Sequence, residues 1–210
     1  MAPALIGMIG RKRTGKDSFA KTLVSELGYQ AVAFADPLRE AALALNPLVG
    51  PTSLPDSLVP AHRTLRDVVE AIGWEAAKDT VPHVRRTLQR LGTDAIRSLD
   101  DGFWVRAAMA RVERLRTIER ASGWSGQTIR EAGGLSVVVT DCRFPNEAEA
   151  IRQAGGVLVR VERPGATAAS EEDLHPSETA LDGFPEDFVV SNTGTLDDLA
   201  GHAREIASYL

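Results

Sequence analysis

The chain has 210 residues, a net charge of −5 and 43% apolar residues, which is enough to build the core of one α/β domain. Basic and acidic residues are mixed along the chain, which argues against a broad nucleic-acid-binding face and leaves a local basic pocket open. No apolar run is long enough to span a membrane. Cys142 is the only cysteine, which excludes an intrachain disulfide framework and a multi-cysteine metal site. Because the apolar N-terminal run is too short for a signal peptide, we expect a soluble protein of a reducing, cytoplasmic setting.

The first elements predict a phosphate-binding loop. Residues 4–9 are apolar and indicate a buried strand, and residues 16–27 indicate a helix that ends at Gly28. Between them lies GRKRTGKDS at 10–18, which contains the pattern G-x-x-x-x-G-K of a P-loop. In such a loop, backbone N–H groups and the helix dipole converge on a polyphosphate, and the lysine reaches its terminal phosphates. The residues predicted to bind nucleotide phosphates are Gly10, Arg13, Thr14, Gly15 and Lys16.

The loop departs from the general motif after the lysine. Asp17 stands where Ser or Thr usually binds magnesium, and a hydroxyl follows one position later, at Ser18. Ser18 is the first candidate for an inner-sphere ligand, and Asp17 competes as a carboxylate ligand or as a first-turn residue favoured by the helix dipole. Arg11, Lys12 and Arg13 either approach the phosphates or form a solvated basic turn.

The next segment predicts a contact with a second substrate. Residues 31–35 indicate a short strand, a helical pattern runs to about residue 44, and the proline-rich stretch 46–60 indicates a loop. Asp36 and Arg39 lie one helical turn apart, so both can point from one face towards a phosphate acceptor. The alternative is a surface ion pair in which Asp36 caps the helix.

Residues 63–99 predict helices rich in arginine, with breaks near Gly73 and at Pro82. Arginine suits bidentate binding of a phosphate, so this segment could hold a phosphorylated acceptor. Gln89 could read a base edge. For each of these side chains the alternative is a solvated helix face. The arginines of the segment are Arg63, Arg66, Arg85, Arg86, Arg90 and Arg97.

The clearest strand spans 135–141 and ends in Asp141, after a predicted helix over 104–121 and a predicted loop over 122–134. A carboxylate at this place holds magnesium or its waters in many P-loop enzymes, and the alternative is a turn residue before Pro145. Arg143 is the best-placed candidate to stabilise charge during phosphoryl transfer, within a basic group that also contains Arg152, Arg160 and Arg163. Cys142 is interpreted as a packing residue.

The remaining pattern predicts the fold class. A helix over 145–154, strands over 157–161 and 188–190 and a terminal helix from Leu196 continue the alternation of strand and helix, which indicates a parallel sheet. The P-loop, Asp36, Asp141 and Asn192 all follow strands, so they should gather at one edge of that sheet. We therefore expect one P-loop domain with a core over 1–45 and 135–210 and a helical insertion over 46–134.

Several segments together resemble one family. The motifs are GRKRTGKDS at 10–18, FADPLRE at 34–40, RRTLQRLGTD at 85–94, DGFWV at 101–105, VVVTDCRFPNEAEAIRQAGG at 137–156, VRVERPG at 159–165, HPSE at 175–178 and SNTGTLDDL at 191–199. In this order they are similar to the bacteriophage-type deoxynucleoside monophosphate kinases, a branch of the P-loop nucleoside monophosphate kinases. The resemblance runs from about residue 5 to the end.

The resemblance implies a three-layer α/β P-loop kinase that uses ATP and Mg²⁺ to phosphorylate deoxynucleoside monophosphates, in the host cytoplasm if a phage encodes it. It implies that Lys16 holds the ATP phosphates, that Asp141 and Arg143 serve the transfer, and that Asn192 lies near the adenine. It also implies acceptor contacts from Asp36, Arg39, Arg85, Arg86 and Gln89. Asp after the P-loop lysine is common in this family. Its members are often dimers, so a homodimer is one expectation, with neither nucleic acid nor membrane as a partner.

Two alternatives stay open from the sequence. One is a kinase of another small phosphorylated acceptor, such as phosphomevalonate or dephospho-coenzyme A, because the loop GRKRTGKD also resembles that of phosphomevalonate kinases. The segments RFPNEAE and HPSE argue against it. The other is a P-loop nucleotide-binding module without kinase activity, which would need a water-activating carboxylate near the γ-phosphate.

Overall fold

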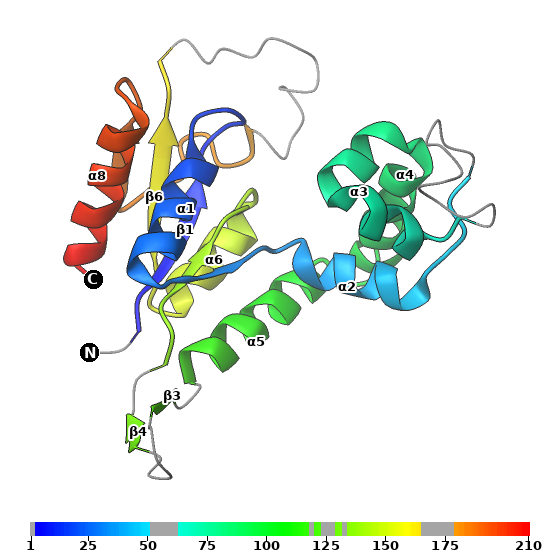
Figure 1. Ribbon diagram of the computed structural model, residues 1–210, viewed down its shortest axis with the longest axis horizontal. Coiled ribbons are helices and arrows are strands. Elements are labelled where there is room, and N and C mark those ends of the chain that lie inside the picture. The colour runs from blue at the N-terminus through cyan, green and yellow to red at the C-terminus, as the bar shows by residue number, and fades with distance from the viewer. Residues whose placement is uncertain (1–2, 51–62, 118–119, 123–128, 132–133, 165–178) are drawn as a thin grey trace. The chain divides into compact units, whose positions relative to one another are not determined.

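A computed structural model describes residues 3–50, 63–117, 120–122, 129–131, 134–164 and 179–210 (Figure 1). Contacts divide the chain into two compact units, one formed by residues 1–34 and 105–210 and the other by residues 35–104. The insertion expected over 46–134 thus overlaps the second unit but has other bounds, and the domain organisation stays a prediction. No helix within the described ranges is long and apolar enough to cross a membrane.

The first unit contains a five-stranded sheet in the order β2-β5-β1-β6-β7, in which every neighbouring pair is parallel. This confirms the predicted parallel α/β fold. The strands are β1 (Leu5–Ile9), β2 (Gln30–Val32), β5 (Val137–Val139), β6 (Val157–Glu162) and β7 (Phe188–Ser191). All five residues of β1 are buried, which explains why the sequence of this strand is continuously apolar.

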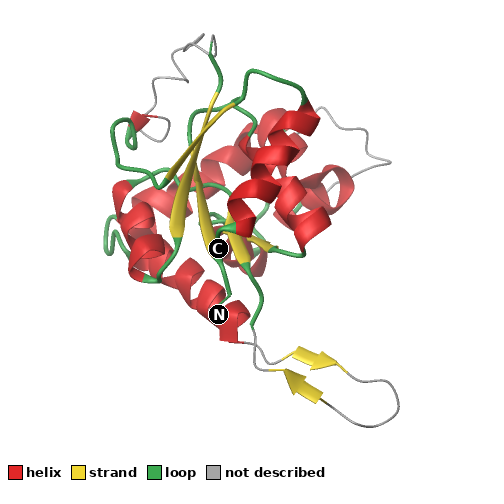
Figure 2. Cartoon of the chain, turned by 90° about the vertical axis from the view of Figure 1, so that its left-hand side faces the viewer, coloured by secondary structure: helices red, strands yellow, loops and turns green. Residues whose placement is uncertain are grey.

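Helices cover both faces of this sheet, which gives three layers (Figure 2). Side chains alternate along β1, so Leu5 and Ile9 face α5 (Phe103–Thr117) and α6 (Pro145–Gln153). Ile6 and Met8 face the other layer, in which α1 (Lys16–Leu27) packs against α8 (Leu196–Ser208). The two apolar layers fix the sheet and therefore the positions of the loops at its carboxyl edge.

The second unit is helical and has its own core. It contains α2 (Asp36–Leu45), α3 (Leu65–Thr80), α4 (Pro82–Gln89) and the π-helical stretch η1 (Arg90–Arg97). The breaks expected at Gly73 and Pro82 occur there: Gly73 has a φ of 76° and kinks α3, and Pro82 begins α4. Its buried side chains are Ala42, Val49, Leu65, Val68, Ala77, Val81 and Val84.

Two expectations are corrected in this part of the chain. The helix expected over 104–121 ends at Thr117, and the loop expected over 122–134 contains strand residues. β3 (Arg120–Ser122) pairs antiparallel with β4 (Ile129–Glu131), so backbone hydrogen bonds between the two segments replace the helical pattern there. Most of the loop expected over 46–60 and the HPSE motif at 175–178 lie outside the described residues.

Candidate functional site

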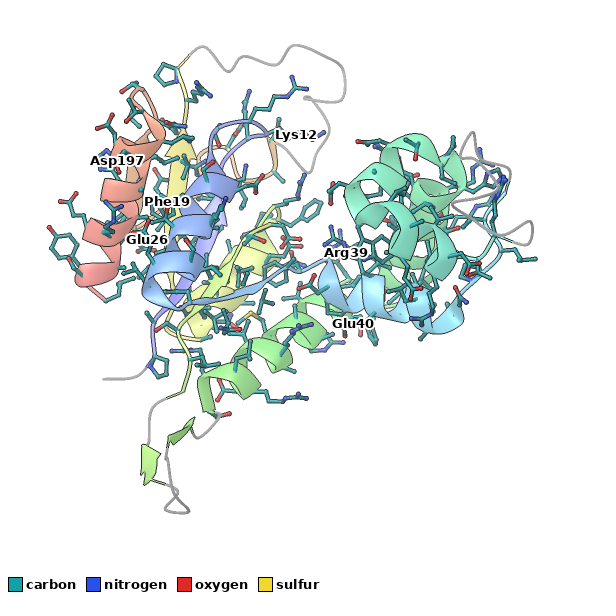
Figure 3. All side chains as sticks on the ribbon, viewed as in Figure 1. Lys12, Phe19, Glu26, Arg39, Glu40 and Asp197 are labelled. Carbon is teal, nitrogen blue, oxygen red and sulfur yellow. The ribbon has the colours of Figure 1, made fainter. Side chains whose placement is uncertain are left out.

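The segment 10–18 forms a tight loop between β1 and α1. Its backbone passes through left-handed conformations at Gly10 (φ 129°), Arg13 (φ 62°) and Gly15 (φ 106°). Gly15 is the N-cap of α1 and has no side chain with which to cap it, so an anion is a natural partner for the N–H groups of the first turn. Lys12 lies exposed in this loop, and Phe19 anchors α1 in the core (Figure 3).

Lys16 lies against the carbonyl oxygens of its own loop. Its ammonium donates to the Gly10 carbonyl at 2.5 Å and also to the Arg11 carbonyl. The Thr14 hydroxyl donates to the same Arg11 carbonyl at 3.0 Å. These bonds link the start of α1 to the beginning of the loop and hold the Lys16 ammonium against the loop backbone. A group with negatively charged oxygens can replace the carbonyl oxygens as the partner of this cation.

The register of the sheet brings the other strand ends to this loop. Gly7 pairs with Val139, and Ile9 pairs with Arg160, so the residues that follow β5 and β6 lie beside the start of the loop. Asp141 follows β5, and its Oδ1 accepts a 2.6 Å hydrogen bond from the Phe34 N–H beyond β2. Asn192 follows β7, and its side-chain amide donates to the Thr14 carbonyl of the loop at 2.8 Å. The P-loop, Asp141 and Asn192 thus lie at the carboxyl edge of the sheet, as expected.

Sequence reasoning missed Glu147, which organises the turn that carries Arg143. Only 4% of Glu147 is exposed, and its carboxylate accepts hydrogen bonds from the N–H groups of Arg143 (2.7 Å) and Phe144 (3.1 Å). The detectable signal is a Glu three residues after the residue that precedes α6, the spacing of a capping box. Burial, and then the carboxylates of Glu147 and Asp141, raise the pKa of the neighbouring Cys142, so its thiol stays protonated.

A cavity of about 350 Å³ opens beside the loop. Gly10, Arg11 and Thr14 line it from the loop, residues 160–164 line it from the end of β6, and Asp182 lines the remaining side. Arg11 donates to Asp182 at 2.6 Å, so the loop is tied to the segment that precedes β7. An anionic or polar ligand in this cavity would lie near both basic and acidic side chains.

Arg160 has a structural role that the sequence did not suggest. Arg160 is 8% exposed, and its guanidinium binds the Glu186 carboxylate at 3.0 Å and the carbonyls of Leu181 (3.0 Å) and Phe184 (2.9 Å). Grouping it with arginines that stabilise a transferred phosphoryl group is therefore not supported, because its donors bind the segment 181–186. Arg152 holds the same region from the surface, through the Pro185 carbonyl at 3.0 Å.

In the second unit, Arg39 is held in place by three neighbours. It lies 3.7 Å from Asp36 and 3.3 Å from Glu75, and its guanidinium lies over the ring of Trp74, 5.8 Å from the ring centroid. About a quarter of each side chain of the Asp36–Arg39 pair is exposed, so the pair is more than a solvated surface contact. Asp36 therefore fixes Arg39 on α2.

The expected acceptor residues of α4 are solvent-exposed. Arg85, Arg86 and Gln89 all lie on exposed positions, and Arg85 binds Asp79 at 3.2 Å. Their predicted contacts with the acceptor stay predictions. Within the described residues, no three His, Cys, Asp or Glu side chains cluster as ligands of a metal ion.

Comparison with known proteins gives one family. The family model described as deoxynucleotide monophosphate kinase matches residues 61–202, well over half of the chain. A putative deoxynucleotide monophosphate kinase of Acanthamoeba polyphaga mimivirus is 29% identical over 195 residues, which cover 92% of this chain and 91% of that protein. The deoxynucleotide monophosphate kinase of Enterobacteria phage T4 is 30% identical over 129 residues, 60% of this chain and 46% of that protein.

Solved structures are more distant. The dephospho-CoA kinase from Campylobacter jejuni covers 100% of this chain with 98% of its own, at 14% identity and a TM-score of 0.47. The shikimate kinase from Aquifex aeolicus reaches a TM-score of 0.43 at 9% identity, covering 97% of this chain and 96% of its own. Likeness at this level says nothing about the substrate.

Proposed function

Because the chain belongs to the deoxynucleotide monophosphate kinase family, whose members phosphorylate deoxynucleoside monophosphates, we propose that ATP is its phosphoryl donor and that the loop 10–16 binds the ATP phosphates. The observation that carries this proposal is the position of Lys16. Its ammonium lies beside the N-terminus of α1 and donates to the carbonyl oxygens of Gly10 and Arg11 within the loop. Phosphate oxygens are stronger partners for the same cation.

In phosphoryl transfer the protein mainly positions the two substrates and stabilises negative charge, and it forms no covalent bond with them. In our proposal the N–H groups of the first turn of α1 and Lys16 orient the donor phosphates. Arg143, on the turn held by Glu147, stabilises the negative charge that builds up on the transferred group. The transferred phosphorus leaves the β-phosphate oxygen of ATP and bonds to a phosphate oxygen of the acceptor, which gives ADP and a deoxynucleoside diphosphate.

The residues at the loop fit a magnesium ion. Mg²⁺ prefers hard oxygen ligands and usually takes only one or two from the protein, the rest coming from phosphates and water. Ser18 in the first turn of α1 and Asp141 after β5 supply a hydroxyl and a carboxylate, and Asp17 is the second carboxylate candidate. When bound, the ion would neutralise charge on the donor phosphates.

We further propose that Arg39 binds the phosphate of the acceptor. The contacts with Asp36, Glu75 and Trp74 fix its guanidinium before any ligand arrives, so little side-chain entropy is lost on binding. Arg85, Arg86 and Gln89 on α4 are the further acceptor candidates.

The test is a coupled ADP-release assay with ATP, Mg²⁺ and dAMP, dGMP, dCMP, dTMP or modified pyrimidine monophosphates as acceptors. We expect ADP release that requires an acceptor, and a loss of about a hundredfold or more in kcat/KM for Lys16→Ala. The matched control is Lys21→Ala, which removes an exposed cation from α1 outside the loop and should stay near wild-type activity. ADP release without any acceptor, combined with no stimulation by any of them, would contradict the proposed ATP-dependent reaction.

A further inference from the structure

We propose that Asn192 is a positioning residue that orients the P-loop for phosphate binding, rather than a residue that reads the adenine. The inference rests on the proposed ATP site. Asn192 follows β7, and its side-chain amide donates a 2.8 Å hydrogen bond to the Thr14 carbonyl, 178 residues earlier in the chain. The end of the sheet is thereby tied directly to the backbone of the loop.

Both partners of this bond are themselves fixed. The Asn192 N–H donates to the Glu162 carbonyl at 2.7 Å, which extends the pairing of β6 with β7 by one residue. Thr14 is 4% exposed, and its hydroxyl donates to the Arg11 carbonyl at 3.0 Å. The amide of Asn192 therefore approaches the loop from a rigid strand end and meets a residue that cannot easily move away.

The bond determines the direction of a phosphate-binding donor. In a trans peptide unit the C=O of one residue and the N–H of the next point in opposite directions. By holding the Thr14 carbonyl, Asn192 makes the Gly15 N–H point away from itself. In P-loops, N–H groups at this place converge on the bound phosphates. Losing the bond would allow the peptide unit between Thr14 and Gly15 to rotate. The phosphate-binding N–H groups of the loop would then have to become ordered at each binding event.

The close packing around Gly15 supports the same conclusion. A Cβ atom at Gly15 would lie 2.5 Å from Asn192 Nδ2 and 3.1 Å from Leu199 Cδ2. Such contacts do not occur in real structures, so the amide of Asn192 occupies the space that any larger residue at position 15 would need. The glycine is thus required both for its φ of 106° and for the approach of Asn192.

The experiment separates the two halves of ATP. Binding of inorganic tripolyphosphate and of adenosine is measured by calorimetry for the wild-type chain and for Asn192→Ala. If Asn192 positions the loop, the variant should bind tripolyphosphate about tenfold more weakly and raise the KM for ATP to a similar degree, whereas adenosine binding and the KM for the acceptor stay unchanged. Weaker adenosine binding with unchanged tripolyphosphate binding would overturn the proposal in favour of adenine recognition.

Two further variants keep the test sharp. Asn192→Asp retains the shape that packs against Gly15 but replaces the donor by an acceptor, and it serves if the alanine variant does not fold. Thr193→Asp puts the same charge on the neighbouring exposed residue, so the loss caused by charge alone is measured there and subtracted. Equal losses in the two variants would contradict a role of the hydrogen bond. If the wild-type chain bound neither tripolyphosphate nor ATP, the proposed donor site would be wrong, and the role of Asn192 in positioning that site would be wrong with it.

Discussion

The Asp141 carboxylate accepts a 2.6 Å hydrogen bond from the Phe34 N–H and so joins the chain beyond β5 to the chain beyond β2. Asp141→Asn should preserve this bond, because the amide oxygen is still an acceptor, while it removes the negative charge. If Asp141 helps to hold Mg²⁺, kcat should fall about a hundredfold and saturation should require more Mg²⁺. A Mg²⁺ titration of the coupled assay measures both effects.

The control for this prediction is Glu149→Gln, which removes an exposed carboxylate from α6. It should leave the Mg²⁺ dependence unchanged. An Asp141→Asn variant with normal kcat and normal Mg²⁺ dependence would reduce Asp141 to a structural turn residue.

Arg39→Ala should affect the acceptor and not the donor. The variant loses a guanidinium held by Asp36, Glu75 and Trp74, so we expect the KM for the deoxynucleoside monophosphate to rise about tenfold or more while the KM for ATP stays constant. Steady-state kinetics with each substrate varied in turn gives both values. Arg66→Ala removes an exposed arginine from α3 in the same unit and should change neither KM. A parallel rise in both KM values would point to general damage to the second unit.

Arg160→Ala should lower stability rather than act on a single kinetic constant. It removes a buried guanidinium and leaves the carbonyls of Leu181 and Phe184 without this donor, which we expect to cost about 2–4 kcal/mol of the free energy of unfolding. Arg152→Ala is the matched control, because it contacts the same region from the surface and should cost under about 1 kcal/mol. Urea unfolding curves give both values, and equal losses would argue against the special role of Arg160.

The capping box of α8 should make stability depend on acidic pH. Hydrogen bonds from the N–H and hydroxyl of Thr195 lower the pKa of Asp198 below its ordinary value of 3.8. Because the pKa is lowered in the folded chain, the contribution is complete well above 3.8 and is lost as the pH falls through the folded value. Asp198→Asn should therefore lower Tm at pH 7, and the difference from wild type should shrink as the pH falls towards 3.

Thermal unfolding between pH 7 and pH 3 measures this dependence. Asp197→Asn changes the same charge in the same first turn without touching the capping box, so it corrects for the interaction with the helix dipole. A constant difference in Tm between Asp198→Asn and wild type across this range would contradict the capping contribution.

The sequence by itself determined the parts of this protein that depend on local pattern. The glycines and the lysine of the loop predicted the P-loop. The continuous apolar runs of β1 and β5, together with the alternation of strand and helix, predicted the parallel sheet. The motif order predicted the family, which the comparisons confirm. These signals are readable because a buried strand, a helix terminus and a phosphate cradle each impose residue types on a short stretch of chain.

Only the tertiary structure decided what distant residues do to one another. Three features depend on how separate segments of the chain meet in the fold. They are the bond from Asn192 to Thr14, the buried contacts of Arg160 with Glu186 and Leu181, and the pairing of β3 with β4. The sequence does not distinguish an arginine or asparagine that binds a ligand from one that binds the protein's own backbone. Burial and the identity of the facing group decide between the two, and both are properties of the folded chain.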